Sequence, residues 1–292
     1  MEEKYDLMKL IQVKYQRLSK GQKLIADFIL NHYDKAAFMT AAKLGNSVGI
    51  SESTVVRFAN ELGYDGYPEL QKSLQELIKN KLTTVQRIEL SNDYMTDDYV
   101  LKAVLKADIE NIKTTLDKID NETFEEVVNR IISANRVYVL GLRSSTALAE
   151  YLGFYLNLIR DNVRVVTYGV SDIFEKLLRL DSDDLIIGIG FPRYSNKTLE
   201  ALRYAKNNGA TVVALTDSVI SPLSENADFT LLAESNMASF VDSLVAPLSL
   251  INALVVAVGL KEKGKLSQTF EKLENMWEEY GIYVKRDPNI GK

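Results

Sequence analysis

Five short apolar segments recur after residue 136, and their alternation with helical periodicity constrains the fold more than any other feature. They are VYVLG (137–141), VRVVTY (163–168), LIIGI (185–189), TVVALT (211–216) and FTLLA (229–233). Short apolar strands separated by helices indicate a parallel, doubly wound α/β sheet. Sheets of this kind bind ligands outside the carboxyl ends of the strands, where the strand order reverses.

The residues after the first and third strands are rich in hydroxyl groups and cations. They are Arg143, Ser144 and Ser145 after the first strand, and Arg193, Tyr194 and Ser195 after the third. Each set precedes a predicted helix. Helix N-termini attract anions, and arginine can donate bidentate hydrogen bonds. We therefore predict that these six residues bind an anionic ligand. Taken singly, each loop also fits a serine cap beside a solvated arginine.

The first 81 residues have helical periodicity, with Ser19 as a predicted N-cap. The stretch LGNSVGISESTVVRFANELGY (44–64) predicts two helices separated by a short turn at Gly49. Ser51 is expected to cap the second helix by accepting from the backbone N–H of Ser53 or Thr54, and Gly63 is expected to end it. This spacing is typical of a helix-turn-helix.

At about 100° per residue, one side of the second helix is apolar and the opposite side is polar. The apolar side carries Val55, Phe58, Ala59 and Leu62, and we expect it to face the core. The predicted DNA-binding residues are Ser51, Ser53, Thr54, Val56, Arg57 and Asn60. Arginine can bond guanine, asparagine can bond adenine, and valine can contact a thymine methyl group in the major groove. An ordinary amphipathic helix in a small bundle has the same pattern.

Charge and cysteine content are compatible with this interpretation. Residues 1–81 hold 12 Lys+Arg against 10 Asp+Glu, whereas the rest of the chain holds 23 against 30. Because this basicity is low for one DNA-binding head, a dimer with two heads is expected to bind more tightly. The chain has no cysteine, which excludes disulfides and thiolate metal sites and fits a reducing cytoplasm. No cofactor and no metal site is predicted.

The pattern predicts three segments: a helix-turn-helix domain (1–81), a linker (82–96) and an α/β domain (97–292) that begins with a helix capped by Thr96 or Asp97. Within the last segment, residues 240–260 carry only one charge, Asp242. That length can span a membrane, but the polar residues Asn252 and Ser249 favour a buried helix. Because this helix is apolar on more than one side, we expect a homodimer or tetramer.

The sequence resembles the RpiR/MurR family of bacterial transcriptional regulators. The first matching motif is GISESTVVRFANELGYDGYPELQ (49–71), which is similar to the family's helix-turn-helix. The second extends from VYVLGLRSSTALA (137–149) through SPLSENADFTLL (221–232) to FVDSLVAPLSLINAL (240–254) and is similar to a sugar isomerase (SIS) domain. The resemblance covers about residues 20–280. It implies a double-stranded DNA operator as partner and an effector site for phosphosugars.

This chain departs from the family's two anion-binding loops. The first usually reads G-x-G-S-S and here contains Arg143 in place of its second glycine. The second usually reads S-x-S-G-x-T and here contains Arg193 in place of its glycine. The resemblance therefore carries the anion-binding role over to Ser144, Ser145 and Ser195. Two added guanidinium groups predict a ligand with more negative charge, or with a carboxylate besides a phosphate.

Two functions compete on the sequence alone. One is a regulator of carbohydrate metabolism in which an anionic metabolite controls DNA binding; the other is a sugar-phosphate isomerase with an added helical domain. Isomerisation needs a general base and usually an acid. The only histidine, His32, lies in the first domain, and Glu150, Glu175 and Glu200 have no evident catalytic partner. We therefore predict a regulator without catalytic residues.

Overall fold

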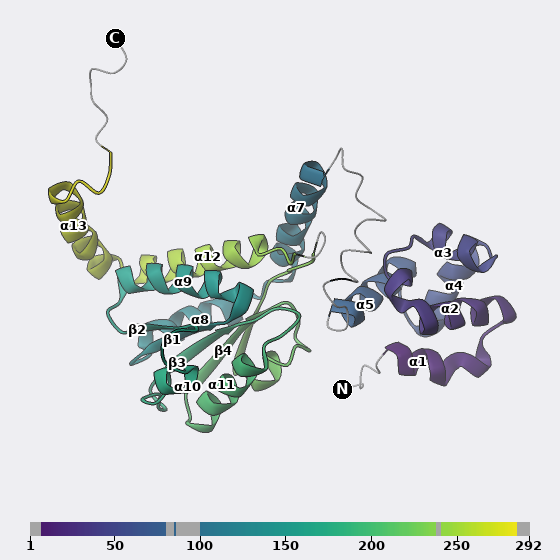
Figure 1. The fold of residues 1–292 in the computed structure, drawn as a ribbon, viewed down its shortest axis with the longest axis horizontal. Helices are drawn as coiled ribbons and strands as arrows, with labels where there is room; N and C mark the ends of the chain where they lie inside the picture. Colours follow the sequence, from purple (N-terminus) through teal and green to yellow (C-terminus); the bar gives the residue numbers. More distant parts are fainter. Residues whose placement is uncertain (1–6, 80–84, 86–99, 238–240, 285–292) are drawn as a thin grey trace, which may run out of the picture. The chain divides into compact units, whose positions relative to one another are not determined.

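The computed structural model describes residues 7–79, 85, 100–237 and 241–284, which form two compact units divided near residue 103. The first unit is helical and the second contains a five-stranded parallel sheet (Figure 1), which confirms the predicted fold class. The predicted linker, apart from residue 85, and the predicted cap at Thr96 or Asp97 lie outside the described residues. The predicted domain boundaries at 81 and 97 therefore stay predictions.

The N-terminal unit packs short helices around an apolar centre. Its described helices are α1 (Leu7–Lys14), α2 (Lys20–Ala36), α3 (Ala41–Val48), α4 (Glu52–Leu62) and α5 (Tyr67–Lys79). Ile25, Ile29, Leu44, Phe58 and Leu70 are fully buried between them. Burial of such side chains from several helices supplies the main driving force for a small helical domain.

Three predicted helix ends, at Ser19, Gly49 and Gly63, are confirmed. Ser19 forms a reciprocal capping box with Gln22 at the start of α2. Gly49 and Gly63 end α3 and α4 in the left-handed conformation, with φ of +74° and +98°. Glycine adopts this region without the steric cost that other residues incur. The two turns are therefore encoded locally, as predicted.

The second unit is a doubly wound sheet. Its strands are β1 (Val137–Gly141), β2 (Val163–Val166), β3 (Leu185–Ile189), β4 (Thr211–Thr216) and β5 (Phe229–Leu232), in the order β2-β1-β3-β4-β5 and all parallel. The strand order reverses between β1 and β3. Because parallel strands leave a crevice at such a reversal, the ligand site is expected at the carboxyl ends of these two strands.

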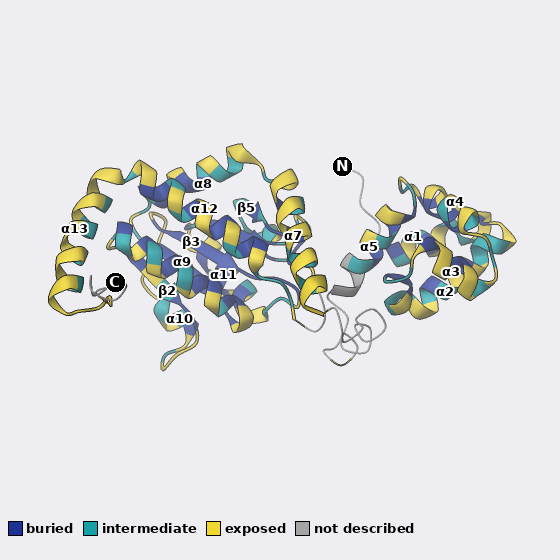
Figure 2. Ribbon diagram, turned by 90° about the horizontal axis from the view of Figure 1, so that it is seen from above, coloured by how far each residue is buried: buried dark blue, intermediate teal, exposed yellow. Residues whose placement is uncertain are grey.

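Helices cover both faces of the sheet. The described helices of this unit are α7 (Val100–Lys118), α8 (Asn121–Ser133), α9 (Thr146–Ile159), α10 (Ile173–Lys176), α11 (Asn196–Asn207), α12 (Val245–Lys261) and α13 (Lys263–Glu279). Val137, Val139 and alternate residues of the other strands pack against α8, α9 and α12. Tyr138, Leu140 and their neighbours pack against α10 and α11 on the other face. Figure 2 shows the resulting buried layer between exposed helix surfaces.

Three predicted element boundaries were wrong. The second strand ends at Val166 rather than residue 168, because Lys176 Nζ donates to the carbonyl of Thr167 (2.8 Å) and the Thr167 hydroxyl donates to Glu150 (3.0 Å). The fifth strand ends at Leu232, one residue early. The short helix after the second strand ends at Lys176 and does not reach Leu178, which is exposed.

The long apolar helix begins at Val245 rather than near residue 240. The Ser243 hydroxyl, just before it, donates to Asp108 of α7 (2.6 Å) and accepts from the backbone N–H of Val245 (3.4 Å). These bonds hold residue 243 outside the helix; Phe240 lies outside the described residues. Within the described ranges, no single helix is long and apolar enough to span a membrane, and α12 with α13 passes the test only as a pair bent by 101°.

Candidate functional site

The surface of α4 matches the predicted division into two sides. Val55, Phe58, Ala59 and Leu62 are buried. Ser53, Arg57 and Asn60 are exposed on the opposite side, and Val56 is half-buried. The helix therefore presents a hydroxyl, a guanidinium, an amide and a small apolar group together, as recognition in the major groove requires.

The N-terminus of α4 carries a cluster of three hydroxyls. Ser51 Oγ lies 3.0 Å from Ser53 Oγ and 3.0 Å from Thr54 Oγ1. Ser51 occupies the N-cap position, but its side chain accepts no backbone N–H, which corrects the predicted cap. Ser51 Oγ is bonded to the Ser53 and Thr54 hydroxyls instead of to a backbone N–H. The Thr54 N–H donates to the Ser51 carbonyl (3.0 Å), so the N–H groups of residues 52 and 53 are the ones left for an incoming phosphate.

Two predicted base-contacting side chains already have partners within the domain. Arg57 Nε donates to the carbonyl of Ser53 (3.3 Å), and Arg57 Nη2 donates to Thr54 Oγ1 (3.4 Å). Asn60 Oδ1 accepts from the backbone N–H of Gly66 (3.1 Å), which fastens the turn after α4. Paired recognition of adenine needs both the oxygen and the nitrogen of the amide, so the second lone pair of this oxygen would have to serve the base.

The second candidate site is the crevice between the carboxyl ends of β1 and β3. These strands are hydrogen-bonded neighbours with Gly141 paired to Ile189. The loop of residues 142–146 (the β1 loop) and the loop of residues 190–195 (the β3 loop) therefore begin side by side. The six predicted effector-binding residues all lie on these two loops, at the reversal of strand order.

The β1 loop is tightly folded. Arg143 begins a short 3-10 turn with a left-handed backbone (φ +58°), and its side chain is exposed. Ser144 is exposed, whereas Ser145 is buried. A Cβ on Gly141 would lie 2.5 Å from the carbonyl oxygen of Ser145, so a glycine is required where the strand meets the turn. The loop thus presents Arg143 and Ser144 to solvent above a rigid base.

The β3 loop is held at both ends. Ser195 caps α11, its hydroxyl accepting from the backbone N–H of Thr198 (3.4 Å). The Tyr194 hydroxyl donates to Asp217 Oδ1 (2.7 Å), which follows β4. Arg193, between a buried Pro192 and these two residues, is exposed. The loop therefore places a guanidinium beside a capped helix N-terminus.

The acidic groups considered for catalysis have structural partners. Glu150 accepts from the Thr167 hydroxyl, Glu175 forms the capping box of α10 with Asp172, and Glu200 pairs with Lys197 (2.9 Å). The hydrogen bond to Glu200 raises the pKa of Lys197. His32 packs against Phe28 in the N-terminal unit. Among the described residues, no group of three His, Cys, Asp or Glu side chains could hold a metal ion.

The sequence analysis missed two polar residues at neighbouring strand ends. Asp217 accepts from both Tyr194 and the Thr216 hydroxyl (3.3 Å), so it fixes the β3 loop. Ser235, which follows β5, is buried, and its hydroxyl has no hydrogen-bond partner among the described residues. Their only sequence signal is position, because each follows a short apolar strand.

Comparisons with known proteins assign one domain family to each of two parts of the chain. The profile of the rpiR-family helix-turn-helix domain matches residues 5–81, and that of the SIS domain matches residues 130–257. An HTH-type transcriptional regulator of Haemophilus influenzae is 28% identical over 269 residues, which make up 90% of this chain and 93% of the relative.

Two solved structures share the fold. The sugar isomerase domain of an RpiR transcription factor from Sphaerobacter thermophilus is 31% identical, with a TM-score of 0.59, over 61% of this chain and 99% of that one. The NanR protein of Vibrio vulnificus, complexed with ManNAc-6P, is 22% identical with a TM-score of 0.55, over 92% of this chain and 98% of that one. The chain therefore belongs to the RpiR family of helix-turn-helix transcriptional regulators, and its second domain is a SIS domain.

Proposed function

We propose that the SIS domain of this regulator binds an anionic, sugar-derived metabolite between the β1 and β3 loops, and that this binding controls attachment of the helix-turn-helix to operator DNA. The observation that carries the proposal is that two loops, each with an exposed arginine (Arg143 and Arg193), begin at the paired ends of β1 and β3, where the strand order reverses. Guanidinium groups and the backbone N–H groups at the N-terminus of α11 donate hydrogen bonds that phosphate and carboxylate oxygens accept.

The chemistry of the crevice favours a ligand with two anionic groups. One group is held by Arg193, Ser195 and the free N–H groups of α11, and the second by Arg143 and Ser144. The SIS-fold NanR protein is complexed with a sugar phosphate, which supports this class of ligand. Sugar phosphates that also carry a carboxylate satisfy both arginines.

Regulation rather than isomerisation follows from the positions of the acidic groups. An isomerase needs a general base within hydrogen-bond reach of its substrate. Glu150 instead pairs with Thr167 after β2, Glu175 with the start of α10, and Glu200 with Lys197 on the surface of α11. The ligand is accordingly bound and released unchanged in the cytoplasm.

DNA is bound through the exposed side of α4. Arg57 reads a base edge, and the Ser51, Ser53 and Thr54 hydroxyls contact phosphate. Two copies of the chain present two heads to a twofold operator, which offsets the low basicity of one head. The effector changes DNA affinity only if it binds the DNA-competent and DNA-free forms with different affinities.

Calorimetry on the full-length chain tests the effector site. Hexose 6-phosphates and phosphorylated sugar acids are titrated into wild type, Arg143→Ala and Arg193→Ala. Each substitution removes a charge-assisted hydrogen bond and is expected to weaken binding by about 1.5–3 kcal/mol. Arg203→Ala, on an exposed position two turns along α11, is the matched control and is expected to bind as wild type. Equal binding by all four proteins would place the site elsewhere.

DNA binding is tested with a DNA fragment from the promoter region of the gene that encodes this chain. Arg57→Ala is expected to weaken specific binding by about 1–3 kcal/mol and binding to random DNA much less. Equal losses on both DNAs would make Arg57 a phosphate contact. If neither changed, α4 would not be the recognition helix.

A further inference from the structure

Helix α7 packs on its own domain with its polar side. Asn111 Nδ2 donates to the carbonyl of Asn236 (3.1 Å), and Thr115 Oγ1 accepts from the backbone N–H of Glu234 (2.9 Å). Its apolar side is exposed instead. Leu105, Ile109, Ile112 and Leu116 are 52%, 52%, 38% and 71% exposed and follow one another at spacings of four, three and four residues. This stripe of four residues (the α7 stripe) covers one side of the helix for more than three turns.

Helix α13 is also incompletely covered by its own domain. None of its 17 residues is buried, and it bends by 101° away from α12, so that Figure 1 shows it extending beyond the α9–α12 layer. Leu266, Phe270, Leu273 and Trp277 (the α13 stripe) line one side of it at the same spacings of four, three and four. The rings of Phe270 and Trp277 lie 6.4 Å apart along that side.

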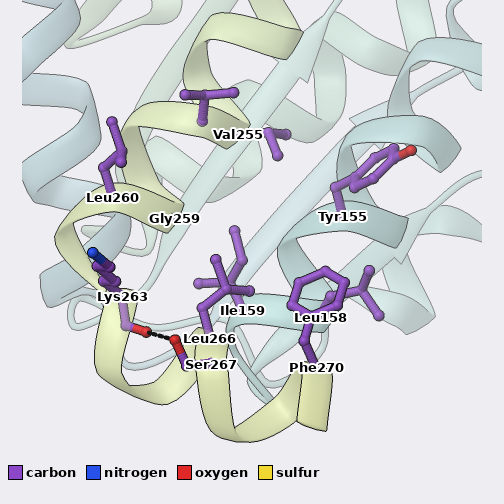
Figure 3. A pocket seen from close by; sticks show the side chains of 11 residues that line it. Tyr155, Leu158, Ile159, Val255, Gly259, Leu260, Lys263, Leu266, Ser267 and Phe270 are labelled. Atoms are coloured by element: carbon purple, nitrogen blue, oxygen red, sulfur yellow. Dashed lines mark hydrogen bonds between the residues drawn. The ribbon is translucent and has the colours of Figure 1, made fainter. Parts of the chain in front are cut away.

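An apolar groove lies where α13 meets α9 and α12. Figure 3 shows Tyr155 and Leu158 from α9, Leu260 from α12 and Phe270 from α13 around a cavity of 490 Å³. Leu260 is 70% exposed. Most residues that line the groove are apolar, and apolar surface grouped in this way is typical of a protein–protein interface. Leu266 and Phe270, the first two residues of the α13 stripe, line the groove, so a helix seated on the stripe also contacts the groove.

The α7 stripe of the same copy cannot reach this groove. Asp108 and Asn111 of α7 are bonded to residues 243 and 236, which precede α12, whereas α13 follows α12. The 17 residues of α12 separate the two ends by about 25 Å. An α7 stripe seated in this groove therefore belongs to a second copy, and a twofold axis forms the contact twice.

Charge selects the pairing of the two stripes. Lys106 and Lys113 lie nearer the α7 stripe on one edge, and Glu110 and Asp117 lie farther round the helix. On the corresponding edge of the α13 stripe, Glu274 lies nearer and Glu271 and Glu278 lie farther round. Two antiparallel helices bring corresponding edges together. Antiparallel contact of α7 with α7, or of α13 with α13, sets like charges against each other. Contact of α7 with α13 sets lysines against glutamates, as at specific helix–helix interfaces.

We infer that α7 of each copy lies antiparallel to α13 of the other, in the groove between α9, α12 and α13. The shared spacing aligns Leu105 with Trp277, Ile109 with Leu273, Ile112 with Phe270 and Leu116 with Leu266, each pair crossing between copies. The inference rests on the proposed pairing of two copies and adds the surface through which they pair. It makes α13 an exchanged arm.

Engineered cysteines test the alignment, because the chain has none of its own. The double variant Ile109→Cys/Leu273→Cys is oxidised at micromolar concentration and resolved on a non-reducing gel. Most of it is expected to migrate as a covalent dimer, and a mixture of the two single variants is expected to cross-link while each alone does not. Ile109→Cys/Gln268→Cys is the control, because Gln268 lies on the opposite side of α13. Far-UV circular dichroism establishes that each variant is folded.

Sedimentation separates failure of this inference from failure of the proposed pairing. A dimer in sedimentation without a cross-link in the double variant overturns the assignment of α7 and α13 and leaves the pairing intact. Cross-linking of Leu273→Cys to itself overturns it equally, because α13 then meets α13. A monomer at micromolar concentration overturns both.

A charge exchange gives an independent measure. Lys106→Glu and Glu274→Lys each replace attraction by repulsion at two related contacts and are expected to raise the dimer Kd about tenfold. The double variant Lys106→Glu/Glu274→Lys is expected to recover most of the wild-type Kd, as coupled neighbours do. Additive losses in the double variant would overturn the contact.

Discussion

The β1 and β3 loops carry the same chemistry on two different backbones. Each has an exposed arginine at a position where the usual loop pattern of the family has glycine. A serine follows that arginine within two residues. Arg143 adopts a left-handed backbone (φ +58°), which disfavours side chains larger than glycine. The backbone of Arg193 has no positive φ, and its loop is held by the bond that Tyr194 donates to Asp217 and the bond that Ser195 accepts from Thr198.

This difference suggests that the two arginines have different structural costs. A left-handed non-glycine residue costs about 1–2 kcal/mol relative to glycine. Strain of this kind persists where the surrounding structure enforces it, and it clusters at ligand sites. We therefore expect Arg143 to oppose folding and serve binding, whereas Arg193 serves binding without a left-handed φ of its own. The following predictions test that contrast.

The largest expected effect is on the rigid base of the β1 loop. In Gly141→Ala the new Cβ would lie 2.5 Å from the Ser145 carbonyl oxygen and 2.7 Å from Ala149 Cβ, and the backbone must shift to relieve both. We expect the free energy of unfolding to fall by about 3 kcal/mol or more. Urea unfolding of the full-length chain measures this.

Gly190→Ala is the matched substitution at the start of the β3 loop. There the nearest atom would be Leu223 Cδ2 at 2.8 Å, at the end of a flexible side chain. We expect a loss of about 1 kcal/mol, because the leucine can change rotamer. Similar losses for both alanine variants would mean that the two loops are equally constrained.

The second prediction separates binding from folding at Arg143. Arg143→Gly removes the left-handed strain and is expected to raise the free energy of unfolding by about 1 kcal/mol, even though glycine adds entropy to the unfolded chain. The same change is expected to weaken binding of a phosphorylated sugar acid by about 1.5–3 kcal/mol. Arg193→Gly should weaken binding similarly but lower stability. A destabilised Arg143→Gly would contradict the contrast.

Much of this architecture could be predicted because it is encoded locally. The alternation of short apolar strands with helical stretches defined the sheet, and the apolar side of α4 was correctly assigned because period and burial agree. The carboxyl ends of β1 and β3 followed from the general rule for doubly wound sheets. The six crevice residues were found in this way, although their role stays a prediction.

Other features depend on contacts that periodicity does not report. The bond from Gly66 to Asn60 and the cluster around Ser51 arise where the turn after α4 and the start of α4 fold back. The exposure of the α7 stripe could not be predicted either, because apolar residues at helical spacing normally indicate a side facing the core. Asn111 and Thr115 instead bury the polar side of that helix against the residues after β5.

The smallest expected effect concerns the bond that fastens the β3 loop to β4. Tyr194→Phe removes the hydroxyl that donates to Asp217 Oδ1 at 2.7 Å and keeps the ring. Asp217 retains the bond from Thr216, so we expect the free energy of unfolding to fall by only about 1 kcal/mol. Binding of a phosphorylated sugar acid is expected to weaken severalfold at most, since Arg193 loses positioning but not charge.

Tyr194→Leu, which also removes the ring, is the comparison. If Leu weakens binding far more than Phe while their stabilities match, Tyr194 stacks on the ligand, and the β3 loop contacts it through more than its arginine and serine. If both variants bind equally well, the tyrosine serves only to hold the loop.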